Sequence, residues 1–274
     1  MSPETTSVEE KETLTEEQKK DRIAELEKVM KENDLLKSIE TRAGYLERFL
    51  YGTNFSVEES FKKIKAFQEL QMEHPEWCTR EAPIEKKSII EMDIRMLLDD
   101  YDKDGRPIYL VKMGNLDVSK MSMYDVVAID DIWLESILSK NPRITKNGLC
   151  VLLDMEKCSW KLMKWLSPEN IKIGVRRTEA LPFSELKVHL VNNSFFVNTI
   201  VRMVWPFLSE RIKNMVIFHP NDWNSLYKYI DQEVLPKEYG GAKNINYTEL
   251  YKKLFQRNDE IFRSFQSYRK TETL

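Results

Sequence analysis

The stretch Val188–Phe207, VHLVNNSFFVNTIVRMVWPF, decides the fold of this chain. It predicts a short buried strand, an Asn-Asn-Ser break and then a helix over residues 195–207. The helix is unusually apolar, because its polar residues are limited to Asn198, Thr199 and Arg202. The order strand, break and helix indicates one unit of an α/β fold.

The apolar residues of this helix cover more of its surface than one contact with a core requires. A first group falls on one line of the helical wheel: Phe196, Ile200, Met203 and Phe207. A second group widens the apolar arc to roughly half the circumference, at about 100° per residue: Val197, Val201, Val204 and Trp205. This width predicts two apolar neighbours, the core on one side and a ligand, partner or membrane on the other.

The composition is that of a globular protein and argues against several classes. The 274 residues are 42% hydrophobic and 32% charged, and the net charge of -3 gives no argument for a nucleic-acid partner. The beginning, MSPETTSVEEKETLTEEQKK, has no apolar core and predicts no signal peptide. No run approaches the roughly 18 apolar residues of a membrane span. Three cysteines without metal-binding spacing, Cys78, Cys150 and Cys158, favour a reducing cytoplasmic compartment.

Patterning divides the chain into a disordered tail (1–15), a helical subdomain (16–98), an α/β domain (99–247) and a helical tail (248–274). In the helical subdomain we expect helices at 16–33, 41–50, 57–73 and 84–98. In the α/β domain we expect strands at 108–113, 148–154, 188–192 and 214–218, which alternate with helices at 124–139, 169–178, 195–207 and 221–233. This alternation predicts a mainly parallel, helix-flanked sheet.

Motifs for chemistry are missing from the sequence. No GxGxxG, GxxxxGK[ST] or GxSxG string occurs, so the usual nucleotide-binding and hydrolase signals are missing. His189 and His219 leave a catalytic dyad open, although packed histidines are favoured. Asp154 ends a strand and is expected to cap the following turn. The acidic cluster Asp99–Asp100 and Asp102–Asp104 lacks EF-hand spacing, so a solvated turn is favoured over a cation site. We predict no catalytic residue, metal or cofactor.

Several strings resemble the CRAL-TRIO lipid-binding family and occur in that family's order. They are YLERFLYGTNFSVEESFKKIKAFQEL (45–70), DKDGRPIYLVKMGNLD (102–117), NGLCVLLDMEKCSW (147–160), VHLVNNSFFVNTIVRMVWPFLSERIK (188–213) and LPKEYGG (235–241). LPKEYGG is the most specific, and the resemblance spans roughly residues 16–247. It is nearer to the animal tocopherol- and retinaldehyde-binding branch than to fungal phosphatidylinositol transfer proteins. It implies a cytoplasmic carrier that encloses one hydrophobic molecule between the sheet and a mobile gate helix.

The resemblance also implies which residues face the ligand, with plain core packing as the alternative for each one. The gate helix contributes Phe196, Val197, Ile200, Val201, Val204 and Phe207. The sheet contributes alternate residues of two strands: Val151, Leu153, Val188 and Leu190. The helix at 124–139 contributes Ile129, Trp133, Ser136 and Ile137. The hydroxyl of Ser136, with that of Thr178 or Tyr109, would orient a polar end of the ligand.

One departure from the family concerns membrane contact. The tocopherol carrier binds phosphoinositide head groups through a basic cluster outside the gate. The corresponding positions here are Tyr51, Thr53, Ser184, Leu186, Arg211 and Met215, of which Arg211 is basic. We therefore expect transient membrane contact through the outer edge of the gate instead, at Arg202, Trp205, Arg211 and Lys213.

These expectations favour a monomeric carrier of an isoprenoid such as tocopherol, a retinoid, a carotenoid or a juvenile hormone-like molecule. Phosphatidylinositol or another phospholipid ranks second, because its head group needs several basic residues at the pocket mouth. Two other classes remain open. One is a non-enzymatic protein-interaction module, in which the apolar helix forms a partner groove. The other is a lipid-modifying enzyme that uses His189 or Asp154.

Overall fold

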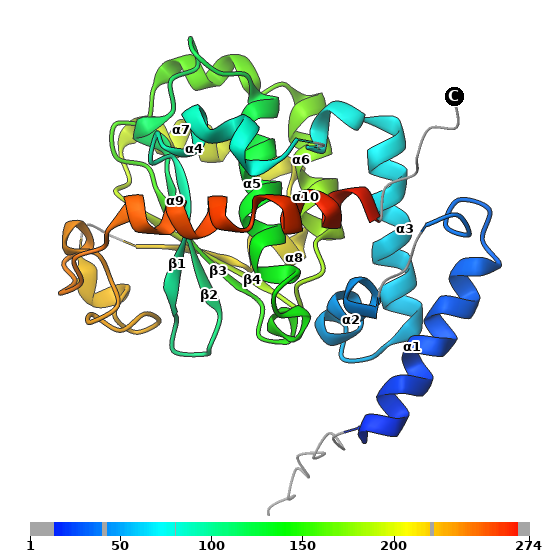
Figure 1. The fold of residues 1–274 in the computed structure, drawn as a ribbon. Coiled ribbons are helices and arrows are strands. Elements are labelled where there is room, and N and C mark those ends of the chain that lie inside the picture. The colour runs from blue at the N-terminus through cyan, green and yellow to red at the C-terminus, as the bar shows by residue number, and fades with distance from the viewer. Residues whose placement is uncertain (1–13, 40–42, 80, 220–221, 268–274) are drawn as a thin grey trace, which may run out of the picture.

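A five-stranded sheet in the order β1-β2-β3-β4-β5 organises the fold (Figure 1). The computed structural model describes residues 14–39, 43–79, 81–219 and 222–267. Its strands are β1 (Arg95–Tyr101), β2 (Pro107–Lys112), β3 (Leu149–Asp154), β4 (Leu186–Val191) and β5 (Val216–Phe218). β1 and β2 form an antiparallel pair, whereas β2 to β5 are parallel. The mainly parallel, helix-flanked sheet is therefore confirmed.

The crossover helices begin at serine caps. α5 (Met123–Leu138), α6 (Pro168–Ala180) and α7 (Phe195–Val204) each follow a serine whose oxygen accepts a backbone N–H of the first turn. These serines are Ser122, Ser167 and Ser194. α7 continues into a 3-10 turn, Trp205–Phe207, and is followed by the short α8 (Glu210–Lys213).

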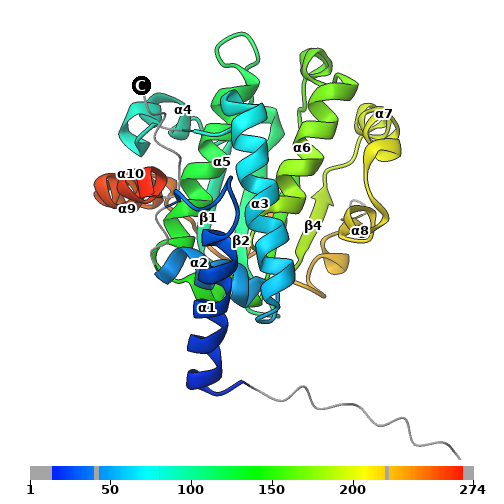
Figure 2. The ribbon, with the colours of Figure 1, turned by 90° about the vertical axis from the view of Figure 1, so that its right-hand side faces the viewer.

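Helices from both ends of the chain surround this α/β unit. α1 (Glu16–Lys31), α2 (Ala43–Gly52) and α3 (Val57–Glu73) form a layer outside α6, against which α3 packs (Figure 2). Gly52 lets α2 approach the backbone at Pro182 closely, because a Cβ at position 52 would lie 1.7 Å from the carbonyl oxygen of Pro182. α9 (Tyr247–Gln256) and α10 (Asn258–Ser267) run across α5 and β1 on another side (Figure 1).

Two predicted helices were wrong. Residues 84–98 form a 3-10 turn, the short α4 (Lys87–Ile90) and then β1, so the sheet begins within the segment expected to be helical. Residues 222–233, within the range predicted as a helix, form a 3-10 turn at Trp223–Ser225 and further turns. Leu226 and Ile230 are both fully buried, and their four-residue spacing imitates a helical stripe.

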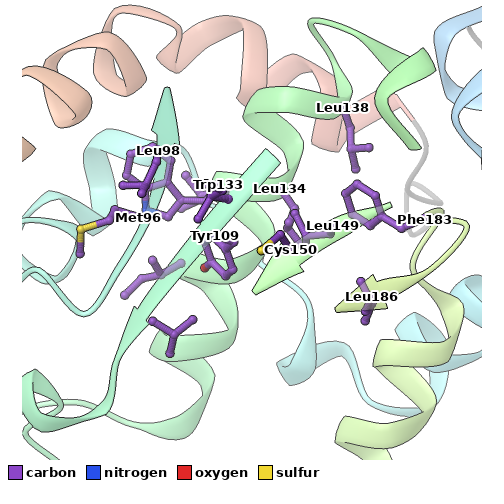
Figure 3. Close-up of a cluster of buried hydrophobic side chains, with 14 of the residues drawn as sticks. Met96, Leu98, Tyr109, Trp133, Leu134, Leu138, Leu149, Cys150, Phe183 and Leu186 are labelled. Atoms are coloured by element: carbon purple, nitrogen blue, oxygen red, sulfur yellow. The ribbon is translucent and has the colours of Figure 1, made fainter. Parts of the chain in front are cut away.

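The two faces of the sheet are covered differently. On one face, Tyr109, Leu149 and Leu186 pack with Trp133 and Leu134 of α5 (Figure 3). The other face carries residues such as Cys150, Leu152 and His189, and it lies under the segment 222–243. That segment contributes Leu226, Ile230, Leu235 and Tyr239 to the core.

Candidate functional site

The predicted floor residues share one face of the sheet. The parallel register pairs Val151 with Val188 and Leu153 with Leu190. Because side chains alternate along a strand, these residues point to the same side. α7 covers that side, since its Val197 packs in one apolar cluster with Leu190. The four residues therefore lie together on the side of the sheet that α7 covers, and their contact with a ligand stays a prediction.

We name the apolar residues beneath α7 the gate cluster. Its buried members are Ile94, Leu116, Val118, Met121, Val126, Met155, Leu162, Leu190, Val197 and Ile200. Leu153, Val201 and Val204 pack against it and are half-buried. The cluster members from the loops after β2 and β3 were not predicted from the sequence. The sequence feature that could have indicated them is the presence of apolar side chains inside otherwise polar loops, at 116–121 and 155–162.

The floor of this site remains accessible although it lies in the middle of the sheet. Val151, Leu153 and Val188 are half-buried, whereas Cys150, Leu152 and His189 on the opposite face are completely buried. A central strand with helices on one side and the 222–243 segment on the other should be buried on both faces. The half-buried side chains on the gate side of β3 and β4 are therefore apolar and only partly covered by the protein.

The residues predicted on α5 lie elsewhere. Trp133, Ser136 and Ile137 line a groove of about 270 Å³ between β1, α5 and α9. Trp133 packs with Tyr251 of α9 there, with ring centroids 6.3 Å apart. Val126 is the α5 residue that reaches the gate cluster. Trp133 lies on the same stripe but seven residues, or about 10 Å, further along the helix.

The remaining predicted residues have varied environments. Ile129 is buried in the main core. Phe207 is half-buried in the 3-10 turn after α7. The side chain of Phe196 is outside the described part of the structure. The hydroxyls proposed to orient a ligand all have protein partners: Ser136 donates to the Trp133 carbonyl, Thr178 to the Gly174 carbonyl and Tyr109 to Asp130.

The start of α7 is fastened by the Asn-Asn-Ser break. Asn192 has a left-handed backbone, with φ of 56°, and its amide donates to Asp154 Oδ1 at 2.7 Å. The Asn193 amide donates to the carbonyl of His219 at 3.3 Å. Asp154 Oδ1 also accepts the backbone N–H of Glu156 at 2.9 Å, which confirms its expected role as a cap. The break is therefore a defined turn held from two sides.

The outer edge of α7 presents apolar and basic side chains. Trp205 lies against Phe218 of β5, with ring centroids 5.9 Å apart, and Phe218 is 41% exposed. Met203 is 38% exposed and Arg202 is exposed beside it. Arg211 is exposed and donates to the Ser184 carbonyl at 3.4 Å, whereas Lys213 pairs with Glu210 at 2.7 Å.

Three of the positions that correspond to the family's basic cluster lie beside a half-buried lysine. Lys63 lines a small hollow with Leu186, Arg211 and Met215. Its ammonium donates to the carbonyls of Leu181, at 2.6 Å, and of Phe183, at 3.3 Å. Burial, and then the nearby Arg211, lower the pKa of Lys63 to about 8. Backbone carbonyls therefore engage the ammonium of Lys63.

The two histidines considered as a dyad form a buried pair behind the sheet. His189 Nδ1 lies 2.9 Å from His219 Nε2, and His219 Nδ1 lies 2.8 Å from Ser225 Oγ. Because His189 alternates with Val188 and Leu190, its side chain points away from the gate cluster. The acidic turn also differs from the expected solvated turn, since Asp102 is buried and pairs with Arg106 at 2.9 Å.

Comparisons with known proteins agree with this geometry. The family model of the CRAL/TRIO domain matches residues 92–241. Clavesin-1 of Rattus norvegicus is 26% identical over 208 residues, which cover 74% of this chain and 58% of that protein. Clavesin-2 of Homo sapiens is 23% identical over 206 residues, which cover 74% of this chain and 63% of that protein. The chain thus spans about three fifths of the length of these curated relatives.

A solved structure, described as the crystal structure of Sfh5, has the same fold. It superposes with a TM-score of 0.55 and 12% identity, and covers 92% of this chain and 100% of its own. Within the described residues, no helix is both long and apolar enough to cross a bilayer.

Proposed function

The chain belongs to the CRAL-TRIO lipid-binding family, and we propose that it carries one small hydrophobic ligand in the space beneath α7. The observation that supports this proposal is the half-burial of Val151, Leu153 and Val188 in the middle of the sheet. Apolar side chains at such a position are stabilised by removal from water. A ligand seated there would cover them, with α7 as its lid.

The energetics of such a site suit a reversible carrier. An isoprenoid would bury on the order of 400 Å² of apolar surface, which corresponds to roughly 10 kcal/mol at about 25 cal/mol per Å². Loss of translational freedom and ordering of the lid offset several kcal/mol of this gain. The remaining affinity falls between about nanomolar and micromolar, which permits both retention and release.

Within this family function we rank an isoprenoid before a phospholipid. The gate cluster consists of apolar side chains, which suit a single-tail hydrocarbon ligand. A phospholipid head group would need cations, and Lys63 is already engaged by backbone carbonyls. Mass spectrometry of lipids extracted from protein purified from its native tissue tests the ranking. A co-purifying phospholipid would reverse it, and an absence of any exchangeable lipid would favour a protein-interaction module.

We also propose binding without chemical conversion by a cytoplasmic monomer. His189 lies on the far face of the sheet, and Asp154 accepts bonds from Asn192, Glu156 and Tyr239. Neither side chain is placed to react with a ligand beneath α7. Product analysis after incubation with candidate ligands should return the ligand unchanged at full occupancy, and a new product would reject this part of the proposal.

Release requires that α7 swing away from the floor. The natural hinges are the Asn192–Ser194 break and Pro206, where the regular helix starts and stops. At a membrane, lipid would cover the inner face of α7 while it is open. This lowers the cost of opening relative to exposure in water.

The test of the pocket is the double substitution Ile200→Asp and Val204→Asp. Ile200 is buried in the gate cluster and Val204 packs against it, so two carboxylates there would need desolvation beneath the lid. We expect ligand affinity to fall at least about 100-fold, which corresponds to about 3 kcal/mol, in a fluorescence or radioligand titration.

The matched control is Met203→Asp, because Met203 lies on the same helix and is 38% exposed. Circular dichroism and thermal unfolding should show that all variants fold. Wild-type affinity in the Ile200 and Val204 variant would refute the placement of the pocket.

A further inference from the structure

The turn that follows β3 combines lysines with exposed aromatic side chains. Residues 157–165, KCSWKLMKW, contain three lysines and two tryptophans and no acidic residue. Trp160 is 60% exposed, and Lys157, Lys161 and Lys164 are exposed around it. Tryptophan and lysine side chains have an apolar body and a polar tip, which suits them to the boundary between lipid and water. We name residues 157–165 the docking turn.

The docking turn is a fixed surface. Its residues 160–165 form a 3-10 helix capped by Ser159, which accepts the N–H of Lys161 at 3.3 Å. Leu162 is buried in the gate cluster, and Trp165 packs against it. Lys164 Nζ donates to the carbonyl of Val118 at 2.6 Å, which joins the turn to the loop after β2. Trp160 therefore remains exposed while the opposite side of the turn is anchored.

The docking turn lies at the same end of the molecule as α7. Both follow the carboxyl ends of adjacent parallel strands, β3 and β4. Figures 1 and 2 show the lime-green turn and the yellow α7 near the same end in two perpendicular views. Since Leu162 and Val197 belong to one cluster, the turn and the lid are coupled through shared apolar contacts.

Further side chains extend the same surface. Trp165 and Lys164 line an open hollow of about 570 Å³ together with Lys120 and Tyr124. Tyr124 is 43% exposed. Three acids lie nearby: Glu156 is 3.2 Å from Lys157, Asp117 is 3.4 Å from Lys120, and Asp125 lines the hollow and pairs with Lys86 at 2.9 Å. The pairs of Glu156 and Asp117 are at the surface and hold their lysines weakly, whereas the charge of Asp125 is matched by Lys86.

We propose that the docking turn binds the surface of anionic bilayers and places the lid of the carrier against lipid. Trp160 enters the head-group region, and Lys157 and Lys161 contact negatively charged head groups. The complementary charge and the exposed tryptophan favour a bilayer over a protein groove. The inference rests on the proposed carrier function, because docking next to α7 gives the ligand a path from the pocket into lipid.

The test measures binding of the full chain to vesicles of phosphatidylcholine with and without phosphatidylserine. A lysine near an anionic membrane strengthens binding by a factor of about 5, so Lys157→Gln with Lys161→Gln should weaken binding to the anionic vesicles about 30-fold. Trp160→Ser should weaken binding to both kinds of vesicle. Phosphatidylcholine brominated in its acyl chains should quench the wild-type tryptophan fluorescence more than that of Trp160→Phe.

The matched controls lie at the opposite end of the sheet. Lys140→Gln with Lys146→Gln removes the same charge from exposed positions before β3, and Tyr101→Ser removes an aromatic side chain that is 53% exposed. These variants should bind vesicles as the wild type does. The proposal would be overturned if the control variants lost as much vesicle binding as the docking variants, or if the wild type did not bind vesicles.

A separate readout distinguishes docking from carriage. The docking variants should keep wild-type affinity for ligand in solution but transfer it more slowly to anionic vesicles. The Ile200→Asp and Val204→Asp variant should lose the ligand but still bind vesicles. If the docking variants transfer ligand at the wild-type rate, docking by this turn is rejected while the carrier function stands.

Discussion

His189 occupies a position in which hydrogen bonding selects one tautomer. The Ser225 hydroxyl donates to the Asp222 carbonyl at 3.0 Å and must therefore accept from His219 Nδ1. His219 Nε2 then accepts from His189 Nδ1, which leaves His189 Nε2 as a buried lone pair without a hydrogen-bond partner among the described residues. Burial, followed by His219, Arg106 and Lys187, lowers the pKa of His189 to about 4.

The lowered pKa makes stability depend on pH. Because the folded chain resists protonation of His189, its contribution to stability is complete above the unfolded pKa of about 6.5 and is lost as the pH falls toward 4. Between pH 7 and pH 5 we expect this group to cost about 2 kcal/mol of unfolding free energy. Urea unfolding at the two pH values measures the loss.

The variant His189→Gln isolates this effect from other titrating groups. It should be less stable than the wild type at pH 7 but should lose about 2 kcal/mol less on acidification. The control His74→Gln replaces a more accessible histidine beside Glu76 and should keep the wild-type slope. An equal loss of unfolding free energy between pH 7 and pH 5 in all three proteins would show that His189 does not titrate in this way.

At the scale of single elements, the Asn-Asn-Ser break sets the angle at which α7 leaves the sheet. Its residue Asn192 combines a left-handed backbone with a hydrogen bond to Asp154. Most L residues avoid this conformation at a cost of about 1 kcal/mol or more, whereas glycine and asparagine tolerate it. The lid is therefore oriented by a local preference of the chain as well as by the gate cluster.

Substitutions at Asn192 separate these contributions. Asn192→Gly keeps the left-handed backbone conformation but loses the hydrogen bond from the side-chain amide to Asp154, so we expect a loss of about 1 kcal/mol in unfolding free energy. Asn192→Ala loses this hydrogen bond and also disfavours the left-handed backbone, so we expect a loss of about 2 kcal/mol in unfolding free energy. Ligand release, followed by stopped-flow fluorescence, should be faster in both variants. Equal stability of the two variants would contradict the role assigned to the left-handed turn.

Most of the helices and strands of the α/β unit could be predicted from the sequence. Apolar patterning located α5, α6, β3 and β4, because each element is specified by its own residues. β1 was missed because the polar second half of RMLLDDY, which lies at an exposed sheet edge, shows no strand alternation. For the site, the strand face followed from alternation. The gate-cluster residues of the loops, and the distance of Trp133 from α7, depend on packing that no local pattern encodes.

At the scale of the whole molecule, one buried ion pair joins segments from both ends of the chain. Arg48 of α2 donates to both carboxylate oxygens of Glu135 on α5, at 2.7 Å and 2.9 Å. Ser264 of α10 donates to the same carboxylate. Both charged side chains are almost completely buried, at 6% and 3% exposure. The N-terminal helices, the α/β unit and the C-terminal helix therefore share one electrostatic contact.

Removal of one side chain of the Arg48–Glu135 pair should lower the unfolding free energy more than removal of both. Arg48→Met removes the cation that donates twice to the buried Glu135 carboxylate, and we expect a loss of about 3–5 kcal/mol in unfolding free energy. Arg48→Met with Glu135→Leu should recover much of that loss, since the buried carboxylate is removed together with the cation. Chemical denaturation of the four proteins in a double-mutant cycle measures the coupling. A double variant as unstable as the sum of its singles would refute it.

The two borders of the sheet have a consequence for encounters between copies of this protein. A bare strand at a border offers its free N–H and C=O groups to any similar strand, which is a common route to aggregation. Here one border strand, β5, has only three residues, and the other, β1, has α9 packed against it and an irregular register between Leu97 and Tyr101. Growth of the sheet from one molecule into the next is disfavoured at both ends. Opening of α7 as proposed would therefore expose its apolar inner face without also offering a template for β-assembly.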